Sequence, residues 1–185
     1  MKEKYFPRVV TGELHVSFAV TEPDAGTDTL NMTTFARKVE GGFLLSGKKT
    51  WITKAQEAER MFILARTQPL SEVSKRTDGL TMFFAPMDRK SIEIRPIKKM
   101  GRNAIDTNEL FIDDLFVSDE DVIGEVGKGF RAIMVGLNAE RVVAANAALG
   151  IGKASIRLAT QYANDRVVFG RPIGQNQAIS HQIAL

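Results

Sequence analysis

A single polar turn, Val20-Thr21-Glu22-Pro23-Asp24-Ala25-Gly26-Thr27-Asp28, organises this chain, and an extended apolar run from His15 to Val20 leads into it. Pro23 presets φ for a turn, and Gly26 allows backbone conformations that other residues avoid. Successive backbone N–H groups in such a turn can bind an anion, and the hydroxyls of Thr21 and Thr27 add further donors. The residues alone leave two readings open, an ordinary connection between strands and a phosphate-binding site.

A second strand-like stretch, Trp51-Ile52-Thr53, carries the only tryptophan of the chain. The indole ring is flat enough to lie beside another planar ring system. An apolar strand, an anion-binding turn and an aromatic ring together favour a site for a cofactor that has both an aromatic ring and a phosphate.

The composition limits the classes of protein that fit. A chain of 185 residues with 44% hydrophobic residues can bury a core in one domain or two small ones. With no cysteine and only two histidines, His15 and His181, we expect no disulfide, cysteine nucleophile or metal site. The densest basic patch, Lys98-Lys99 with Arg102, fits a solvated loop better than a nucleic-acid site. No signal peptide or membrane span is apparent, so we expect a soluble intracellular protein.

The sequence pattern in the first two thirds of the chain predicts strands. Residues 1–14 are polar and predict a connector, whereas residues 15–125 predict a domain of about seven short strands separated by Gly, Pro and Asp turns. Glu40-Gly41-Gly42 predicts a hairpin turn. The expected architecture is an antiparallel β-barrel or sandwich. The strand-like runs are Met32–Val39, Phe43–Leu45, Met61–Ala65, Leu80–Ala85, Ser91–Arg95 and Asp106–Val117.

The pattern changes in residues 126–185, which predict the start of a helical domain. Phe130–Asp165 lacks proline and is rich in Ala, Leu, Ile and Arg, so it predicts one long helix or two nearly continuous ones. Phe169–Pro172 predicts a turn, and a second helix starts near Gln175 and is unfinished at Leu185. We therefore expect an α+β chain whose helical bundle is truncated.

Glu140 is the residue of the predicted long helix that most suggests a catalytic role. Steps of three and four residues place it in a stripe of apolar and small residues. Removing water from a carboxylate makes it a stronger base, which proton abstraction near neutral pH requires. A structural ion pair with an arginine of another element is the open alternative. The stripe comprises Ile133, Leu137, Glu140, Ala144, Ala147 and Ile151.

With these motifs in order and at these spacings, the chain resembles the acyl-CoA dehydrogenase family of flavoproteins over nearly its whole length. The motifs that carry the resemblance are Val20–Pro23, Ala25–Asp28, Trp51–Thr53, Met100–Arg102, Gly124-Glu125, Gly127 with Gly129-Phe130, Asn138–Arg141, Tyr162-Ala163, Arg166, Phe169-Gly170 and Gln177–Ile179.

The resemblance implies a middle β-barrel domain followed by the first helices of a C-terminal four-helix bundle. It implies oxidation of acyl-CoA thioesters to trans-2-enoyl-CoA, in which a glutamate removes the α-proton and the β-hydrogen leaves as hydride to FAD. It further implies an electron-transfer flavoprotein as acceptor, a homodimer or homotetramer, and a location in the bacterial cytoplasm or the mitochondrial matrix.

The resemblance also implies roles for individual residues. Residues near the flavin ring are Phe18, Val20, Thr21, Trp51, Ile52 and Thr53, and Gly26 and Thr27 would hold the pyrophosphate. Arg166, Phe169, Asn176 and Gln177 match residues that bind the FAD of a neighbouring subunit. Thr27 would also lie near the CoA chain.

The acyl-CoA site would include Asn138, Glu140 and Arg141. Glu140 followed by Arg141 matches the subgroup that places the catalytic base on this helix. The alternatives are that the base lies in sequence beyond Leu185, that the chain is an acyl-CoA oxidase or flavin monooxygenase relative, or that it is a non-catalytic, flavin-free fragment.

Overall fold

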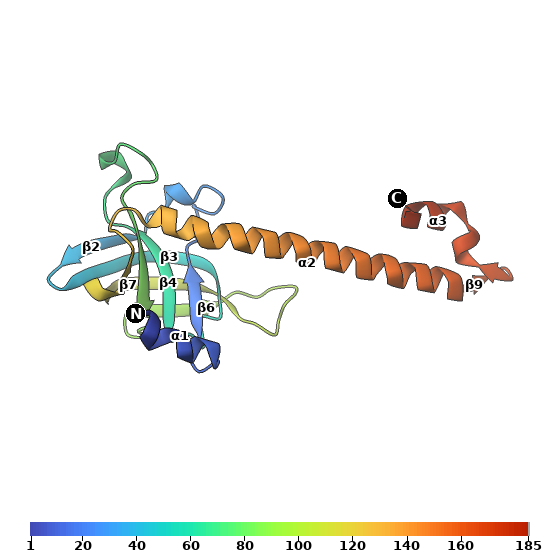
Figure 1. Ribbon diagram of the computed structural model, residues 1–185, viewed down its shortest axis with the longest axis horizontal. Coiled ribbons are helices and arrows are strands. Elements are labelled where there is room, and N and C mark those ends of the chain that lie inside the picture. The colour runs from blue at the N-terminus through green and yellow to red at the C-terminus, as the bar shows by residue number, and fades with distance from the viewer. Residues whose placement is uncertain (185) are drawn as a thin grey trace. The chain divides into compact units, whose positions relative to one another are not determined.

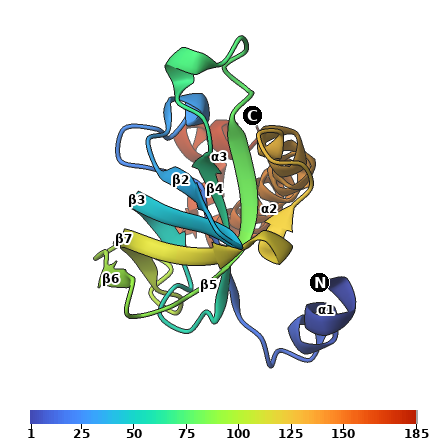
Figure 2. The same ribbon diagram turned by 90° about the vertical axis from the view of Figure 1, so that its left-hand side faces the viewer.

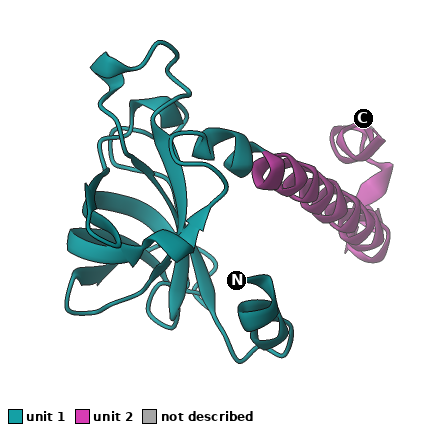
Figure 3. Cartoon of the chain, turned by 60° about the vertical axis from the view of Figure 1, so that its left-hand side comes forward, with its two compact units in different colours: residues 1–134 teal, residues 135–185 magenta. Residues whose placement is uncertain are grey.

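The computed structural model describes residues 1–184, which divide into two compact units (Figure 3). The first unit is Met1–Met134 and the second begins at Val135.

The first unit is built on one eight-stranded sheet (Figures 1 and 2). Its hydrogen-bonded order is β6-β7-β3-β2-β4-β5-β8, and β1 pairs with β4. The strands are β1 (Val16–Ala19), β2 (Phe35–Val39), β3 (Gly42–Thr53), β4 (Arg60–Arg66), β5 (Leu80–Pro86), β6 (Ile92–Pro96), β7 (Thr107–Ser118) and β8 (Val122–Ile123).

The sheet is mixed, which differs from the purely antiparallel arrangement that the sequence predicts. β1 runs parallel to β4 in the register Val16 to Arg60, and β2 meets the end of β4 in parallel at Phe35 and Arg66. All other neighbours are antiparallel. Local periodicity sets which face of a strand is buried but not the direction of its partner. The predicted α+β class is confirmed.

The core lies inside the curl of this sheet. Phe43 of β3 packs edge-on against Phe83 of β5, with ring centroids 5.2 Å apart, although these strands are not neighbours in the sheet. The predicted hairpin turn is present between β2 and β3, where Val39 pairs with Gly42. Asp106–Val117, predicted as one or two strands, is the single strand β7, whereas β8 was not predicted.

A short helix, α1 (Lys2–Val10), lies within the stretch that the sequence analysis expects to be a polar connector. Tertiary contacts stabilise it: the ring of Tyr5 packs edge-on against Phe84 at 5.0 Å, and Arg8 pairs with Glu59 at 3.1 Å. Contacts of this kind with the sheet are not readable from the polar sequence around Pro7. Three-residue 3-10 helices cover Thr29–Asn31, Leu70–Glu72, Asp119–Asp121 and Ile173–Gln175.

The long helix α2 (Gly129–Asp165) is continuous, as predicted, and it begins in the first unit. A Cβ atom at Gly129 would lie 2.4 Å from the backbone nitrogen of Met82. Only glycine therefore allows the first turn of α2 to pack this closely on β5, and Ile133 is buried one turn later.

The rest of the second unit follows α2. Strands β9 (Val167–Val168) and β10 (Arg171–Pro172) form a small hairpin at the predicted turn, with Phe169 at φ 52° and Gly170 at φ 76°. Helix α3 covers Gln177–Ala184, two residues later than its predicted start. Leu185 lies outside the described residues.

By length and composition alone, α2 is apolar and long enough to cross a membrane, and it is the only such helix among residues 1–184. No apolar run of that length is expected from the sequence. One helix of this kind is weak evidence for a membrane span, because core helices of water-soluble proteins have the same composition.

Candidate functional site

The two stretches singled out by the sequence lie side by side. The backbone N–H of Thr50 donates to the carbonyl of Thr21 at 2.9 Å. This bond forms where β3 leaves its partner: β3 pairs with β7 at Lys49 and again at Ile52, and the residues between them bulge out of the ladder. The bulge therefore brings the Trp51 stretch to the polar turn.

Trp51 is presented to solvent by this bulge. Its backbone has φ 62°, a left-handed conformation that is uncommon for a bulky residue. The side chain is 61% exposed, although Ile52 next to it is buried. Phe18, which lies at the end of β1 near the turn, is 41% exposed. Two aromatic residues of the candidate site are thus exposed at the edge of the sheet.

The polar turn is closed at its base and open on its outer side. Glu22 and Ala25 exchange two backbone hydrogen bonds of 3.2 Å, which tightens the turn around Pro23. Gly26 and Thr27 are exposed, and no atom lies within 4 Å of the position that a Cβ at Gly26 would occupy. The backbone after Ala25 is therefore accessible to a bulky anion, which fits the pyrophosphate of a dinucleotide.

A buried ion pair supports the turn from below. Lys49 Nζ lies 2.9 Å from a carboxylate oxygen of Glu22, and their side chains are 0% and 4% exposed. Lys49 Nζ also donates to the carbonyl oxygens of Val20 at 3.0 Å and Leu64 at 2.8 Å. A lysine ammonium has three N–H donors, so all of them are used.

The carboxylate of Glu22 is equally well bonded. It accepts from the backbone N–H and the hydroxyl of Thr33 at 2.7 and 2.9 Å, and from the backbone N–H of Thr34 at 3.0 Å. Burial alone would raise the pKa of Glu22, but the Lys49 charge and these hydrogen bonds outweigh it and lower the pKa to about 2. Burial lowers the pKa of Lys49 to about 8, against the attraction of Glu22. Both groups are therefore charged at neutral pH.

Arg66, at the end of β4, ties down the segment that follows the turn. Its Nε donates to the carbonyl of Met32 at 3.2 Å, and one terminal nitrogen donates to the carbonyl of Leu30 at 2.6 Å. At the surface, Arg76 pairs with Asp28 at 2.8 Å. The loop from β1 to β2 is thus held to β4 at Leu30 and Met32 and to the loop after β4 at Asp28.

Asn108 of β7 performs the same task for the Trp51 stretch. It is fully buried, and its side-chain amide donates to the carbonyl of Ile52 at 3.1 Å. Its own carbonyl oxygen accepts from the side chain of Gln56 at 3.2 Å. The backbone N–H of Gln56 in turn donates to Asp106 at 3.1 Å.

Lys49, Arg66 and Asn108 were not predicted from the sequence. One signal was available for Lys49: the alternation of Phe43 and Leu45 along β3 continues to residue 49 and places it on the core side of the strand. A lysine at an inward position needs a buried acidic partner. Glu22 is that partner, and it lies in the turn itself.

Asn138, Glu140 and Arg141 lie on α2 in the second unit, and all three are exposed. Arg141 donates to the side-chain oxygen of Asn138 at 2.9 Å. The expected apolar surroundings of Glu140 are absent from the described part of the chain. Of the predicted stripe, Ile133 is buried, whereas Ile151 is 67% exposed. An apolar stripe on a helix becomes a dry site only when another element covers it, and residues 1–184 do not supply that element.

The other predicted cofactor residues of the second unit gather at the β9–β10 hairpin and the start of α3. The side chain of Phe169 is 99% exposed, and Asn176 accepts a hydrogen bond from Arg171 at 2.8 Å. The backbone N–H of Ile173 donates to the carbonyl of Arg166 at 2.9 Å. Along α2, Glu140 lies roughly 38 Å from Asp165 at the end of the helix. The two groups of residues on the second unit therefore cannot meet at one site on the same chain.

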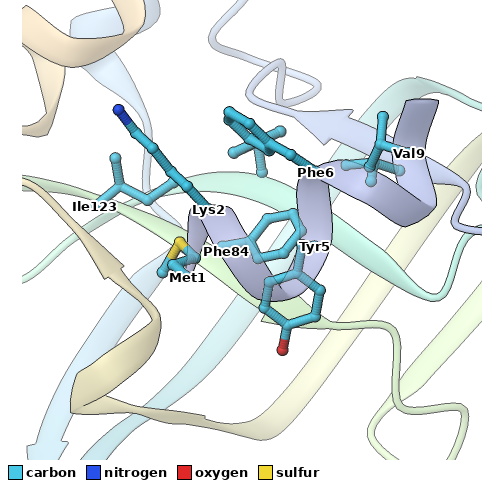
Figure 4. Close-up of a pocket in the computed structure, with 9 residues that line it drawn as sticks. Met1, Lys2, Tyr5, Phe6, Val9, Phe84 and Ile123 are labelled. Carbon is cyan, nitrogen blue, oxygen red and sulfur yellow. The ribbon is translucent and has the colours of Figure 1, made fainter.

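A separate apolar pocket of about 260 Å³ lies between α1 and the sheet (Figure 4). Phe6 and Val9 of α1 line one side, and Phe84 and Ile123 line the other. Its lining includes none of the predicted cofactor or substrate residues.

Comparison with known proteins identifies the family. The family model described as acyl-CoA dehydrogenase, middle domain, matches residues 17–115, and the one described as acyl-CoA dehydrogenase, C-terminal domain, matches residues 127–185. The second match covers the whole of α2. That helix is accordingly part of a domain of this family.

Individual relatives agree with these matches. Mitochondrial isovaleryl-CoA dehydrogenase of Solanum tuberosum is 35% identical over 99% of this chain and 44% of its own length. The structure of a glutaryl-coenzyme A dehydrogenase–glutaryl-CoA complex is 34% identical, with a TM-score of 0.90 over 99% of this chain and 46% of that one. The FAD complex of PigA is 32% identical, with a TM-score of 0.87 over 99% and 47%.

This chain thus spans about half the length of the relatives that it matches. Two family models cover most of it in the order of its two units, and the resemblance stated from the motifs is confirmed. The chain belongs to the acyl-CoA dehydrogenase family.

Proposed function

We propose that this chain forms the middle and early C-terminal part of an FAD-dependent acyl-CoA dehydrogenase, which oxidises acyl-CoA thioesters to trans-2-enoyl-CoA. In this proposal residues 1–14 are a connector, residues 15–125 the middle domain and residues 126–185 the start of the helical domain. The observation that carries it is the hydrogen bond from Thr50 to Thr21, since it joins the open turn to the exposed Trp51.

The first unit would bind the flavin. Phe18, Val20 and Thr21 would contact its ring, largely through backbone and hydroxyl groups. Trp51 would flank the ring next to Ile52, Thr53 would reach its N5 region, and Gly26 and Thr27 would hold the pyrophosphate. The open backbone after Ala25 and the two exposed aromatic residues support this assignment. When bound, FAD supplies the acceptor for the hydride that leaves the β-carbon of the substrate.

Glu140 would act as the base that removes the α-proton of the acyl-CoA. Asn138 and Arg141 would contact the substrate next to it, with Thr27 near the CoA chain. The hydrogen bond between Arg141 and Asn138 supports a shared polar surface on this helix. Because Glu140 is exposed in this chain, its action as a base requires a covering element that excludes water.

Arg166, Phe169, Asn176 and Gln177 would serve the flavin of a neighbouring subunit. The roughly 38 Å of helix that follow Glu140 support this, since the hairpin cannot reach the same site as Glu140. We therefore propose a homodimer or homotetramer that passes electrons to an electron-transfer flavoprotein. The proposed location is the bacterial cytoplasm or the mitochondrial matrix.

Titration of the purified chain with FAD tests the binding part of this proposal. Binding should quench the fluorescence of Trp51, the only tryptophan, and give protein-bound flavin absorption. A matched titration of Trp51→Phe should retain the flavin absorption with no such quenching signal. No binding at high FAD concentration would contradict the proposal.

Anaerobic mixing of isovaleryl-CoA with the FAD-loaded full-length enzyme, in which further elements can cover Glu140, tests the chemistry. The substrate should bleach the flavin absorption, and slow recolouring in air would favour a dehydrogenase over an oxidase. Glu140→Gln should keep bound flavin and lose the bleaching. Rapid bleaching in Glu140→Gln would remove Glu140 from the role of base.

A further inference from the structure

We propose that Lys49 is a positioning residue that holds the flavin-binding turn and the Trp51 stretch in register. The proposal rests on the proposed function, because it assigns the turn to the cofactor. Lys49 itself touches no cofactor or substrate, since its side chain is fully buried.

The ammonium of Lys49, which β3 carries, joins the turn to β4. It donates to the carbonyl of Val20 at the start of the turn, to the carboxylate of Glu22 in the turn and to the carbonyl of Leu64 in β4. These contacts are 3.0, 2.9 and 2.8 Å long and converge on one nitrogen atom. Lys49 thereby fixes the turn to the sheet at two residues, Val20 and Glu22.

The same residue precedes the bulge that presents Trp51. Lys49 is the last residue of β3 paired with β7 before the bulge, and it pairs with Leu110. The next residue, Thr50, donates its N–H to Thr21, which lies between Val20 and Glu22. Two adjacent residues of β3 therefore bond three adjacent residues of the turn.

Removing the ammonium would leave the buried carbonyl of Val20 without this donor and the buried carboxylate of Glu22 without its counter-charge. Buried polar groups move to find new partners or water. Movement of Val20 and Glu22 would draw Thr21 away from Thr50 and change the surroundings of Trp51. Arginine cannot replace this lysine, because its donors are spread over a planar fork and do not converge on one point.

The main test is the double variant Lys49→Met with Glu22→Gln. It removes both charges, so no unpaired ion remains in the core. Lys48→Met is the matched control, because Lys48 is the preceding residue of β3 and forms a partly exposed ion pair with Glu109 at 2.9 Å. The readouts are the FAD dissociation constant, the emission of Trp51 and amide hydrogen exchange in residues 20–28 compared with β4.

We expect the folded double variant to bind FAD about tenfold more weakly, with altered Trp51 emission and faster exchange confined to the turn. Lys48→Met should match the wild-type protein. A folded double variant with wild-type emission and wild-type exchange in the turn would overturn the proposal, as would a change of exchange that is equal in the turn and in β4.

A second variant covers the case in which the double variant does not fold. The chain has no cysteine, so Lys49→Cys can be alkylated at that position alone while unfolded and then refolded. Aminoethylation restores an ammonium at nearly the same reach, whereas carboxamidomethylation does not. Only the aminoethylated protein should recover wild-type Trp51 emission and turn exchange; equal behaviour of the two products would reject the role of Lys49.

These readouts separate two failures. If the wild-type chain binds no FAD, the proposed function fails, and Trp51 emission and amide exchange still decide whether Lys49 positions the turn. If the wild-type chain binds FAD and the variants do as well, with unchanged emission and exchange, only the role of Lys49 fails.

Discussion

Lys49 Nζ lies 2.9 Å from the carboxylate of Glu22, and this pair connects the central strand β3 to the turn that precedes β2. Every N–H of Lys49 has an acceptor, and Glu22 has donors besides Lys49 on Thr33 and Thr34. Removing one partner of such a buried ion pair strongly destabilises a protein, although the intact pair adds little stability compared with an apolar pair of similar size. The effect of the pair is to specify where the turn lies.

The pair predicts that the protein loses stability in acid. The pKa of Glu22 is lowered from 4.5 to about 2 on folding, so its contribution is fully present above pH 4.5 and is lost as the pH falls toward 2. The loss should be on the order of 3 kcal/mol. Urea unfolding measured between about pH 6 and pH 2.5 checks this. The Lys49→Met, Glu22→Gln double variant should lose less stability over the same range, and an equal loss would contradict the role of Glu22.

Removing only Lys49 should destabilise the protein far more than removing both charges of the pair. Lys49→Met alone leaves a buried carboxylate without its counter-charge, and we expect a loss of about 3–5 kcal/mol in the free energy of unfolding. Adding Glu22→Gln should recover a large part of that loss. Lys48→Met, which removes a partly exposed pair on the same strand, should change stability by at most about 1 kcal/mol. Equal effects of Lys48→Met and Lys49→Met in urea unfolding would show that burial of the pair is unimportant.

Much of the fold could be predicted from local patterns. The alternation in Ser91–Arg95 and the apolar run Met61–Ala65 predict strands because one period of two residues sets the buried face. The parallel pairing of β1 with β4 could not be predicted in this way, because it joins segments more than forty residues apart. Helix α1 was missed for a related reason: Tyr5 gains its partner Phe84 only in the folded chain.

The candidate site was predictable where exposed residues carry a pattern and missed where buried polar residues support them. Thr21 and Trp51 stand out because a polar turn and a lone tryptophan are unusual in an apolar context. Lys49 and Asn108 are polar residues within strands; the alternation along β3 hints that Lys49 faces inward, but only the fold shows which groups satisfy the two side chains. The surroundings of Glu140 were predicted from one helix, but a dry environment depends on elements that cover the helix.

Asn108 should be required for the stability of the Trp51 stretch. Asn108→Ala removes the buried donor to the Ile52 carbonyl and the partly buried acceptor for Gln56. We expect a loss of about 1–3 kcal/mol, together with altered Trp51 emission. Asn146→Ala is the matched control, since the Asn146 side chain is exposed and bonds only within α2. Urea unfolding followed by Trp51 fluorescence measures both, and a cost for Asn146→Ala as large as for Asn108→Ala would refute the prediction.

Two glycines of α2 should respond in opposite directions to alanine. A Cβ at Gly129 would lie 2.4 Å from Met82 N and 2.7 Å from the carbonyl carbon of Thr81, so the helix would have to move away from β5. Backbone atoms cannot rotate aside as a flexible side chain can, and we expect a loss of about 1–3 kcal/mol. At Gly150 no atom lies within 4 Å of the Cβ position, so Gly150→Ala should stabilise the helix by about 0.5–1 kcal/mol. The free energy of unfolding of the two variants, with helix content followed by circular dichroism, measures the difference. If both substitutions changed the free energy of unfolding in the same direction, close packing of α2 on β5 would not explain the need for glycine at residue 129.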